Sequence, residues 1–102
     1  MGTKLSAHDE ELYRRTDEVL HYVWDPIGVS GAPEARDEYY SYLPQVFALL
    51  RAGAAPEQLA AHLEESATVS MGLEGNLEHT LKVVKLLLRW KAVLHAKYAP
   101  LS

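Results

Sequence analysis

The sequence of 102 residues contains no cysteine. Disulfides, thiol nucleophiles and thiolate metal sites are therefore excluded. No apolar run approaches the length of about 18 residues that a membrane-spanning helix needs, so we expect no membrane partner. The first residues run directly into charged positions and lack the apolar core of a signal peptide. These absences fit a reducing compartment, and we expect a cytoplasmic protein.

Acidic residues are missing from the last part of the chain. Up to Glu78 there are 14 acidic and 5 basic residues, a charge of −9, whereas the 5 basic residues beyond it give +5, so the whole chain carries −4. Acids early and bases late along one helix complement its dipole, and bases on a polar face are ordinarily solvated. The chain is acidic overall and has no basic stripe with interleaved aromatics, so we expect no nucleic-acid partner.

Apolar residues, which make up 48% of the sequence, recur at helical spacing. The spacing predicts helices at about 7–23, 42–52, 56–66 and 77–98. A chain of this length holds one core, so we expect residues 1–102 to form a single domain. The sequence therefore predicts an all-α fold, an irregular four-helix bundle with an ordered loop after the first helix.

Residues that start or stop helices stand at the predicted boundaries. Side chains with a polar oxygen cap the first amides, and proline suits a first turn because its missing amide costs little there. Glycine and the residue before proline favour leaving the helical conformation. The expected starts are Ser6, Ser41 with Pro44 in the first turn, Pro56 and Asn76. The expected stops are Asp25-Pro26, Gly53 and Pro100.

The connection between Ile27 and Glu38 contains two glycines and a proline, which exclude a long helix. Trp24 and Ile27 are large apolar side chains that can pack inward against the second and fourth helices. They would pin the connection to the core, so we expect an ordered loop. Asp25 is expected to accept hydrogen bonds from loop amides ahead of Pro26.

The predicted helix at 77–98 is the longest and carries the widest apolar face. Its expected core positions are Leu77, Leu81, Val84, Leu87, Leu88, Trp90, Val93, Leu94 and Tyr98. Those of the other helices are Leu12, Val19, Leu20, Val23, Leu43, Val46, Phe47, Leu49, Leu50, Leu59, Ala60 and Leu63. The face of the longest helix is wider than three shorter helices can cover, which predicts a homodimer through it.

Metal and catalytic constellations are weak. Glu18 and His21 have the Glu-x-x-His spacing of di-iron bundles, but a second copy and two further inward acids are missing. A histidine that complements the negative end of a helix is the simpler interpretation of His21. His62, His79 and His95 lack zinc-binding spacing and are expected at the surface or its boundary. No serine has the glycine context of a nucleophile, and we predict no catalytic residue, no metal and no cofactor.

Tyrosines and acids gather in one short segment. Its members are Asp37, Glu38, Tyr39, Tyr40 and Tyr42. This composition is typical of a recognition surface, because tyrosine offers contact area and a polar tip at small entropic cost. Tyrosines buried in the core with bonds to the backbone are the simpler interpretation, and the two interpretations can hold for different residues.

Several short motifs resemble a family of small bacterial proteins of unknown function. They lie within Asp17 to Leu73 and comprise Val23–Val29, Ala35–Tyr39, Ser41–Val46, Ala61–Leu63 and Met71–Leu73. The resemblance implies a compact helical domain and no established activity. Members usually carry Asp where this chain has Tyr40, and often Ile-Glu where it has Ser66-Ala67. Because the Trp-Asp-Pro and Asp-Glu-Tyr motifs recur together, we expect the two segments to touch.

Three functional hypotheses remain open. We favour a non-catalytic protein-interaction domain of the immunity-inhibitor type, which binds another protein such as a basic toxin domain. Its expected recognition or structural residues are Trp24, Asp25, Asp37, Glu38, Tyr39, Tyr40 and Tyr42. The alternatives are a structural or engineered helical scaffold without ligand, and a ligand-binding or enzymatic bundle. The second alternative would use Asp25, Asp37, Glu38 and His21 in a pocket near Trp24.

Overall fold

Four α-helices contain most of the residues that the computed structural model describes, which are residues 5–99. They are α1 (Ala7–Val19), α2 (Leu43–Arg51), α3 (Pro56–Glu65) and α4 (Leu77–Lys97). A π-helical turn, Leu20–Trp24, continues α1, another, Ser66–Ser70, continues α3, and a 3-10 turn spans Pro33–Ala35. No strand occurs within residues 5–99. The predicted all-α fold and its four helices are confirmed.

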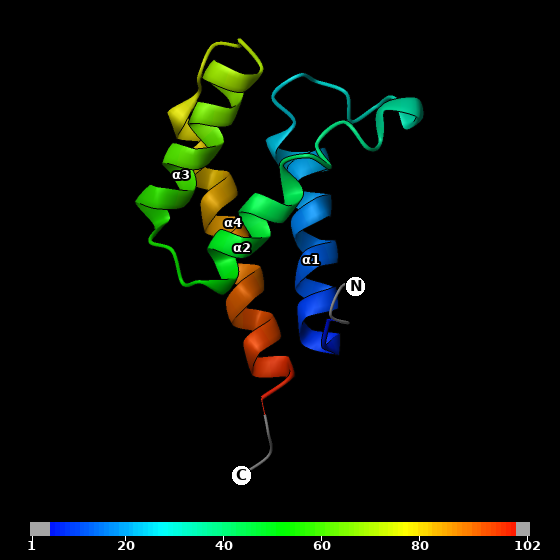
Figure 1. The fold of residues 1–102 in the computed structure, drawn as a ribbon, viewed down its shortest axis with the longest axis vertical. Helices are drawn as coiled ribbons and strands as arrows, with labels where there is room; N and C mark the ends of the chain where they lie inside the picture. The colour runs from blue at the N-terminus through cyan, green and yellow to red at the C-terminus, as the bar shows by residue number, and fades with distance from the viewer. Residues whose placement is uncertain (1–4, 100–102) are drawn as a thin grey trace.

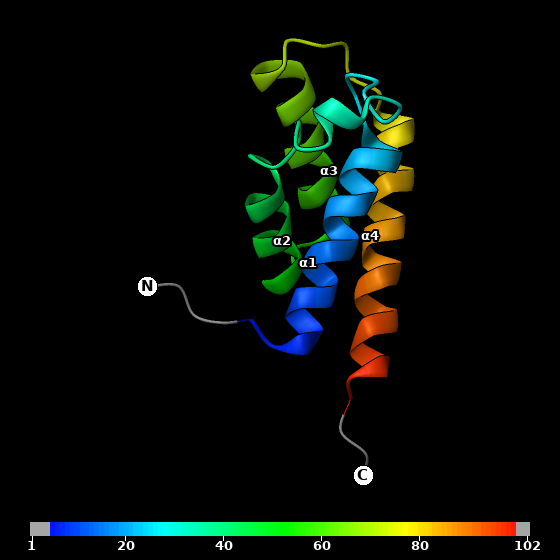
Figure 2. The ribbon, with the colours of Figure 1, turned by 90° about the vertical axis from the view of Figure 1, so that its right-hand side faces the viewer.

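The helices alternate in direction along the long axis of the molecule (Figure 1). Helix α4 is the longest, with 21 residues, and it packs against α1, α3 and α2. The view turned by 90° shows α1 and α4 side by side (Figure 2). Short connections between antiparallel neighbours, such as the one from α2 to α3, produce this up-down-up-down bundle.

Helix starts follow local side-chain chemistry at three of the four predicted positions. The Asp9 amide donates to Ser6 Oγ at 3.1 Å, and the His79 amide donates to Asn76 Oδ1 at 3.1 Å. Pro56 opens α3 as predicted. At Gly53 the backbone takes a φ of +76°, the left-handed conformation that ends α2 at low cost for glycine.

The predicted N-cap at Ser41 is wrong. Helix α2 begins at Leu43, and its capping residue, Tyr42, makes no side-chain capping bond. The chain approaches through consecutive turns, in which the Tyr42 and Leu43 amides donate to the Tyr39 carbonyl at 3.0 and 3.2 Å. Because these turns already satisfy the first amides, the helix needs no hydroxyl at Ser41.

The core is formed by the inward faces of all four helices. Its buried apolar members include Leu12, Val19, Leu20, Trp24, Leu43, Val46, Phe47, Leu50, Leu59, Ala60 and Leu63, as predicted. On α4, Val84, Leu87 and Leu94 are also buried as predicted. Thr16 lies among them without exposure, because its hydroxyl donates to the Leu12 carbonyl at 2.7 Å.

Helix α4 carries more apolar surface than its neighbours cover. Val83, which the sequence analysis did not assign, is completely buried. Four predicted core positions of α4 are exposed instead: Leu77 (56%), Leu81 (46%), Val93 (49%) and Tyr98 (38%). Periodicity alone could not place the centre of so wide an apolar arc, and the centre falls on Val83 and Leu87. Val23, predicted inward on the first helix, is also exposed.

Two further predictions concern the chain ends. The expected helix stop at Pro100 and the expected absence of a signal segment at Met1 to Lys4 fall outside the described residues. Helix α4 ends at Lys97, with Tyr98 as its C-cap. Within residues 5–99, no helix has the length and apolarity needed to cross a membrane.

Candidate functional site at the loop end

Asp25 organises the turn that follows the first helix. Its backbone takes a φ of +33°, and within residues 5–99 it is the one non-glycine residue with a positive φ. Its carboxylate compensates by accepting three loop amides: Gly28 at 3.1 Å and Val29 at 2.8 Å on Oδ1, and Ser30 at 3.0 Å on Oδ2. A short carboxylate that bonds nearby amides stabilises this left-handed conformation. The predicted role of Asp25 in bonding loop amides is confirmed.

Tyr39 joins this turn to the segment before α2. Its side chain is buried, and its hydroxyl donates to Asp25 Oδ1 at 2.7 Å while accepting the Ile27 amide at 3.0 Å. Its ring lies 5.4 Å from the Trp24 ring, centroid to centroid. The expected contact between the Trp24 turn and the Asp37–Tyr39 segment is therefore confirmed. We call Asp25, Tyr39 and Trp24 the loop hub.

The electrostatics of the loop hub fix the protonation of both polar groups. Burial by itself would raise the pKa of Asp25, but the hydrogen bonds from Tyr39 and from the Val29 and Ser30 amides outweigh it and leave the pKa below 3.8. Burial and the hydrogen bond to Asp25 both raise the pKa of Tyr39 well above 10.0. Near neutral pH, an ionised carboxylate thus accepts from a protonated phenol.

Trp24 is buried as predicted, and its ring also lies 6.2 Å from that of the half-buried Tyr42. Ile27 was predicted to pack inward, and this is wrong, because 42% of it is exposed. Tyr39 holds the loop through the Ile27 backbone amide. The Ile27 side chain therefore is not needed as an anchor and stays at the surface.

The loop hub leaves a group of side chains exposed around it, which we call the loop surface. Its members are Tyr22, Ile27, Glu34, Asp37, Glu38 and Tyr40. Tyr22 is 58% exposed and Tyr40 is 49% exposed. The tyrosine cluster predicted from the sequence is thus divided, with Tyr39 in the core and Tyr40 outside. Asp37 and Glu38 are exposed and do not join the Asp25 carboxylate.

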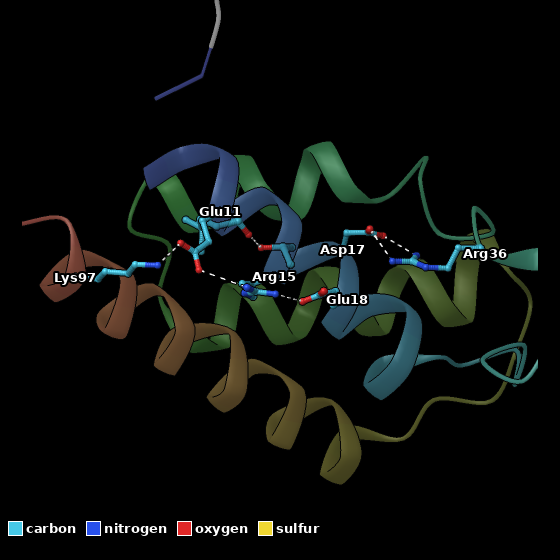
Figure 3. Close-up of polar contacts among 8 residues, drawn as sticks. Glu11, Arg15, Asp17, Glu18, Arg36 and Lys97 are labelled. Atoms are coloured by element: carbon cyan, nitrogen blue, oxygen red, sulfur yellow. Dashed lines mark hydrogen bonds and ion pairs between the residues drawn. The ribbon is translucent and has the colours of Figure 1, made fainter. Parts of the chain in front are cut away.

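Arg36 lies against Tyr22 of the loop surface. Its guanidinium binds Asp17 of α1 through two bonds of 3.0 and 2.8 Å (Figure 3). The hydrogen bond to Asp17 raises the pKa of Arg36, and Tyr40 and Tyr22 add smaller contributions of the same sign. The guanidinium also lies 5.3 Å from the centre of the Tyr22 ring. Arg36 is therefore held by the molecule itself.

His79 is half-buried, at the boundary of the core as predicted. Its Nε2 lies 2.7 Å from the Val23 carbonyl oxygen and 3.2 Å from that of Trp24. It ties the first turn of α4 to the end of the π-helical turn. His21 is buried against Tyr22, with ring centroids 4.5 Å apart. Glu18, its partner in the suspected metal motif, binds Arg15 at 2.7 Å instead.

A polar groove of about 510 Å³ lies beside Trp24, between the ends of α1 and α3 and the start of α4. Glu64 lines it, and its Oε1 accepts the Asn76 amide at 3.1 Å and the Thr80 hydroxyl. Glu74 lines it as well, together with Asp25 and His79. Asp37, Glu38 and His21 do not line the groove, so the carboxylates suspected from the sequence are not brought together. Within residues 5–99, no group of three or more His, Asp or Glu side chains could hold a metal ion.

Glu64 and His79 were missed by sequence reasoning. Their partners lie 12 to 56 positions away in the chain, beyond any local pattern. The only local sign was the position of His79 three residues after the N-cap Asn76, where a side chain can reach the neighbouring helix.

Comparisons with protein-family models, with curated proteins and with solved structures found no match. The resemblance to a family of small bacterial proteins therefore stays a prediction.

Proposed function

We propose that the protein is a non-catalytic protein-interaction domain, and that the loop surface binds a basic surface on another protein. One observation carries the proposal. The loop hub, with the buried Trp24 and Tyr39 and the half-buried Asp25, fixes the loop. Tyr22, Ile27 and Tyr40 remain exposed, and the three exposed acids of the loop surface have no ion pair within residues 5–99. Rigid aromatic side chains with polar tips are typical anchors of protein interfaces.

Preorganisation supports this role. Binding by a flexible loop costs about 0.5–1.5 kcal/mol for each mobile side chain that becomes ordered. Here the backbone of the loop is already held by four bonds to Asp25, three from amides and one from Tyr39. The loop surface can therefore keep one shape before and after a partner binds.

The charge of the loop surface supports a basic partner. Glu34, Asp37 and Glu38 are exposed, and the nearby Arg36 is neutralised by Asp17. The acids therefore remain available to attract positive charge, which accelerates encounter and orients the complex. An inhibitor that masks a basic toxin domain, as immunity proteins do, needs a small acidic domain with these properties.

Co-expression with the product of an adjoining gene tests this function. We expect the two proteins to copurify, and we expect the domain to protect cells if that product is toxic. The double variant D37K/E38K should abolish both effects, whereas the matched double variant E57K/E65K, at exposed positions of α3, should retain them. Failure to copurify with any neighbouring product, or equal effects of both variants, would reject the proposal.

The groove beside Trp24 favours a second candidate, a ligand-binding role. Its lining includes Glu74 and Glu64, although one oxygen of Glu64 already accepts two hydrogen bonds. A small cation such as a polyamine is therefore the class of ligand that the groove would suit. Titration with spermidine while monitoring the fluorescence of the two tryptophans tests this role. Saturation that is lost in E74A would support it, and an unchanged spectrum up to about 10 mM would reject it.

A further inference from the structure

The outward face of α4 combines charge and apolar surface in a particular order. Lys82, Lys85 and Arg89 occur three and seven positions apart and are exposed, so they form one ridge along the helix. No acid follows Glu78 in the sequence. Lys82 approaches Glu78 only at 4.0 Å, with both side chains highly exposed, and Lys85 and Arg89 form no ion pair within residues 5–99.

Apolar side chains flank the basic ridge on both sides. Leu77 and Leu81, one helical turn apart, are exposed along one flank. On the other flank, Leu86, Trp90 and Val93 follow the same spacing and, together with Arg89, line a shallow apolar hollow of about 200 Å³. We call the ridge and its two flanks the α4 face.

Arg15 of α1 supports Trp90, one of the residues that line the hollow. The Arg15 guanidinium lies 5.1 Å from the centre of the Trp90 ring. Arg15 is itself held by Glu18 at 2.7 Å and by Glu11 at 3.5 Å, as Figure 3 shows. Trp90 is thereby fixed from the α1 side, while its other side remains available to a ligand.

The position of the basic ridge between two apolar flanks favours some classes of partner over others. A helix that lies in a membrane surface needs one continuous apolar stripe flanked by bases, whereas here the bases lie between two apolar flanks. The homodimer expected from the sequence would pair α4 with α4, and in such a symmetric dimer the basic ridges would face each other and repel. An acidic amphipathic helix avoids both difficulties, because its carboxylates can face the ridge while its apolar residues cover the hollow.

We propose that the α4 face binds an acidic amphipathic helix of another protein, with an apolar side chain in the Trp90 hollow and carboxylates paired to Lys85 and Arg89. This mode is the familiar docking of a helix onto a matching apolar and charged surface. It is independent of the loop surface, which lies at one end of the bundle and has the opposite charge. A single chain would then join a basic partner and an acidic one.

The experiment uses the full chain and a synthetic helical peptide of leucine and glutamate as the probe. Binding is followed by amide chemical shifts in low salt. We expect a dissociation constant below about 1 mM, with shift changes confined to residues 77–93. A peptide with lysine in place of glutamate, and one with serine in place of leucine, should each bind at least about tenfold more weakly, because each lacks one half of the recognition.

Variants with reversed charges separate the effect of the basic ridge from that of the overall charge of the chain. K85E/R89E should weaken binding at least about tenfold, whereas R14E on the exposed face of α1 should change it less than about twofold. L81S and V93S, both at exposed positions, should weaken binding without unfolding the chain. Circular dichroism of every variant establishes that the helices remain formed.

Several results would overturn the proposal. They are a dissociation constant weaker than about 1 mM, equal binding by the lysine peptide, shift changes confined to the loop surface, and a stable homodimer whose interface is the α4 face. If the full chain bound anionic phosphatidylserine vesicles through residues 77–97 in preference to the peptide, the proposal would also be overturned. Loss of the loop-surface function in D37K/E38K leaves the peptide result unaffected, so the two proposals fail separately.

Discussion

At each of two places in the bundle, a carboxylate and a tyrosine join separate segments of the chain. The other hydrogen-bond partners of the carboxylate differ between the two places. At the loop end, Asp25 accepts three backbone amides and a buried phenol. At the opposite end of α1, Glu11 accepts Lys97 Nζ at 2.8 Å and the Tyr98 hydroxyl at 2.7 Å, as Figure 3 shows for Lys97. The Asp25 bonds fix the backbone of a loop and include the buried Tyr39, whereas the Glu11 bonds come from exposed side chains that can return to water. We therefore expect the loop hub to determine stability and the Glu11 contact to adjust it.

The largest effect is expected for Asp25→Ala. The substitution leaves three loop amides and the Tyr39 hydroxyl without their acceptor and places alanine at a φ of +33°. Leaving the part-buried Val29 amide and Tyr39 hydroxyl without an acceptor costs about 1–3 kcal/mol, and the left-handed conformation adds about 1–2 kcal/mol. We expect a loss of about 3 kcal/mol in urea unfolding. The matched change Asp37→Ala, at an exposed carboxylate, should cost less than about 0.5 kcal/mol. Equal effects of the two would refute the structural role of Asp25.

Tyr39→Phe should come next. It retains the ring that packs on Trp24 but removes the hydroxyl that serves Asp25 and the Ile27 amide. We expect a loss of about 1–2 kcal/mol in the free energy of unfolding. Tyr40→Phe is the control and should be nearly neutral, because Tyr40 is exposed. A stable Tyr39→Phe variant with an unchanged loop would show that the ring alone holds the hub.

The stability that Tyr39 provides should also depend on pH. The pKa of Tyr39 lies above 10.0 in the folded chain, so the folded state binds its proton more tightly. Its contribution is fully present below pH 10.0 and is lost as the pH rises through the folded pKa. In a spectroscopic titration, we expect one of the six tyrosines to ionise only as the protein unfolds. That late component should be missing in Tyr39→Phe.

Glu11→Gln should have a smaller effect than Tyr39→Phe. Hydrogen bonds from Lys97 and Tyr98 lower the pKa of Glu11 from 4.5 to about 2. Its contribution is therefore present above pH 4.5 and is lost as the pH falls toward about 2. We expect the difference in urea midpoint between wild type and Glu11→Gln to vanish over this range and to shrink in high salt. A difference that persists at pH 2 would show that Glu11 acts through packing instead.

The smallest effect on stability is expected for Tyr40→Ala. Because Tyr40 is exposed, we expect a change below about 0.5 kcal/mol. Binding of a basic partner at the loop surface should nevertheless weaken about tenfold, because an aromatic anchor is removed. Isothermal titration with the copurified partner measures this, with Tyr13→Phe as a control for tyrosine loss elsewhere in the fold.

The helices were predictable because their limits are set by local chemistry. Ser6, Asn76, Pro56 and Gly53 each act within one turn of the chain, and each is found in its expected role. The Asp25 turn was predictable for the same reason, since its amide partners lie within five positions of it. Local structure can therefore be predicted from the sequence when the hydrogen-bond donor and acceptor are neighbours in the chain.

The remaining features depend on contacts that sequence spacing does not contain. Exposure of Ile27 could not be foreseen, because it follows from the bond that its amide makes with Tyr39. The choice of Val83 over Leu81 as a core position depends on where α1 and α3 approach α4. The role of His79 depends on carbonyls more than 50 positions away. Which tyrosines are buried and which are exposed likewise depends on the tertiary arrangement.

The separation of bonded residues along the chain has a consequence for the order of folding. The bonds of the loop hub join residues at most 14 positions apart, so closing them costs little chain entropy. Those that attach α4 to the end of α1, such as His79 to the Val23 carbonyl, close loops of more than 50 residues. Local contacts form fastest. We therefore expect the loop end to assemble early and α4 to dock on α1 late, so that the chain builds its acidic surface before it completes its core.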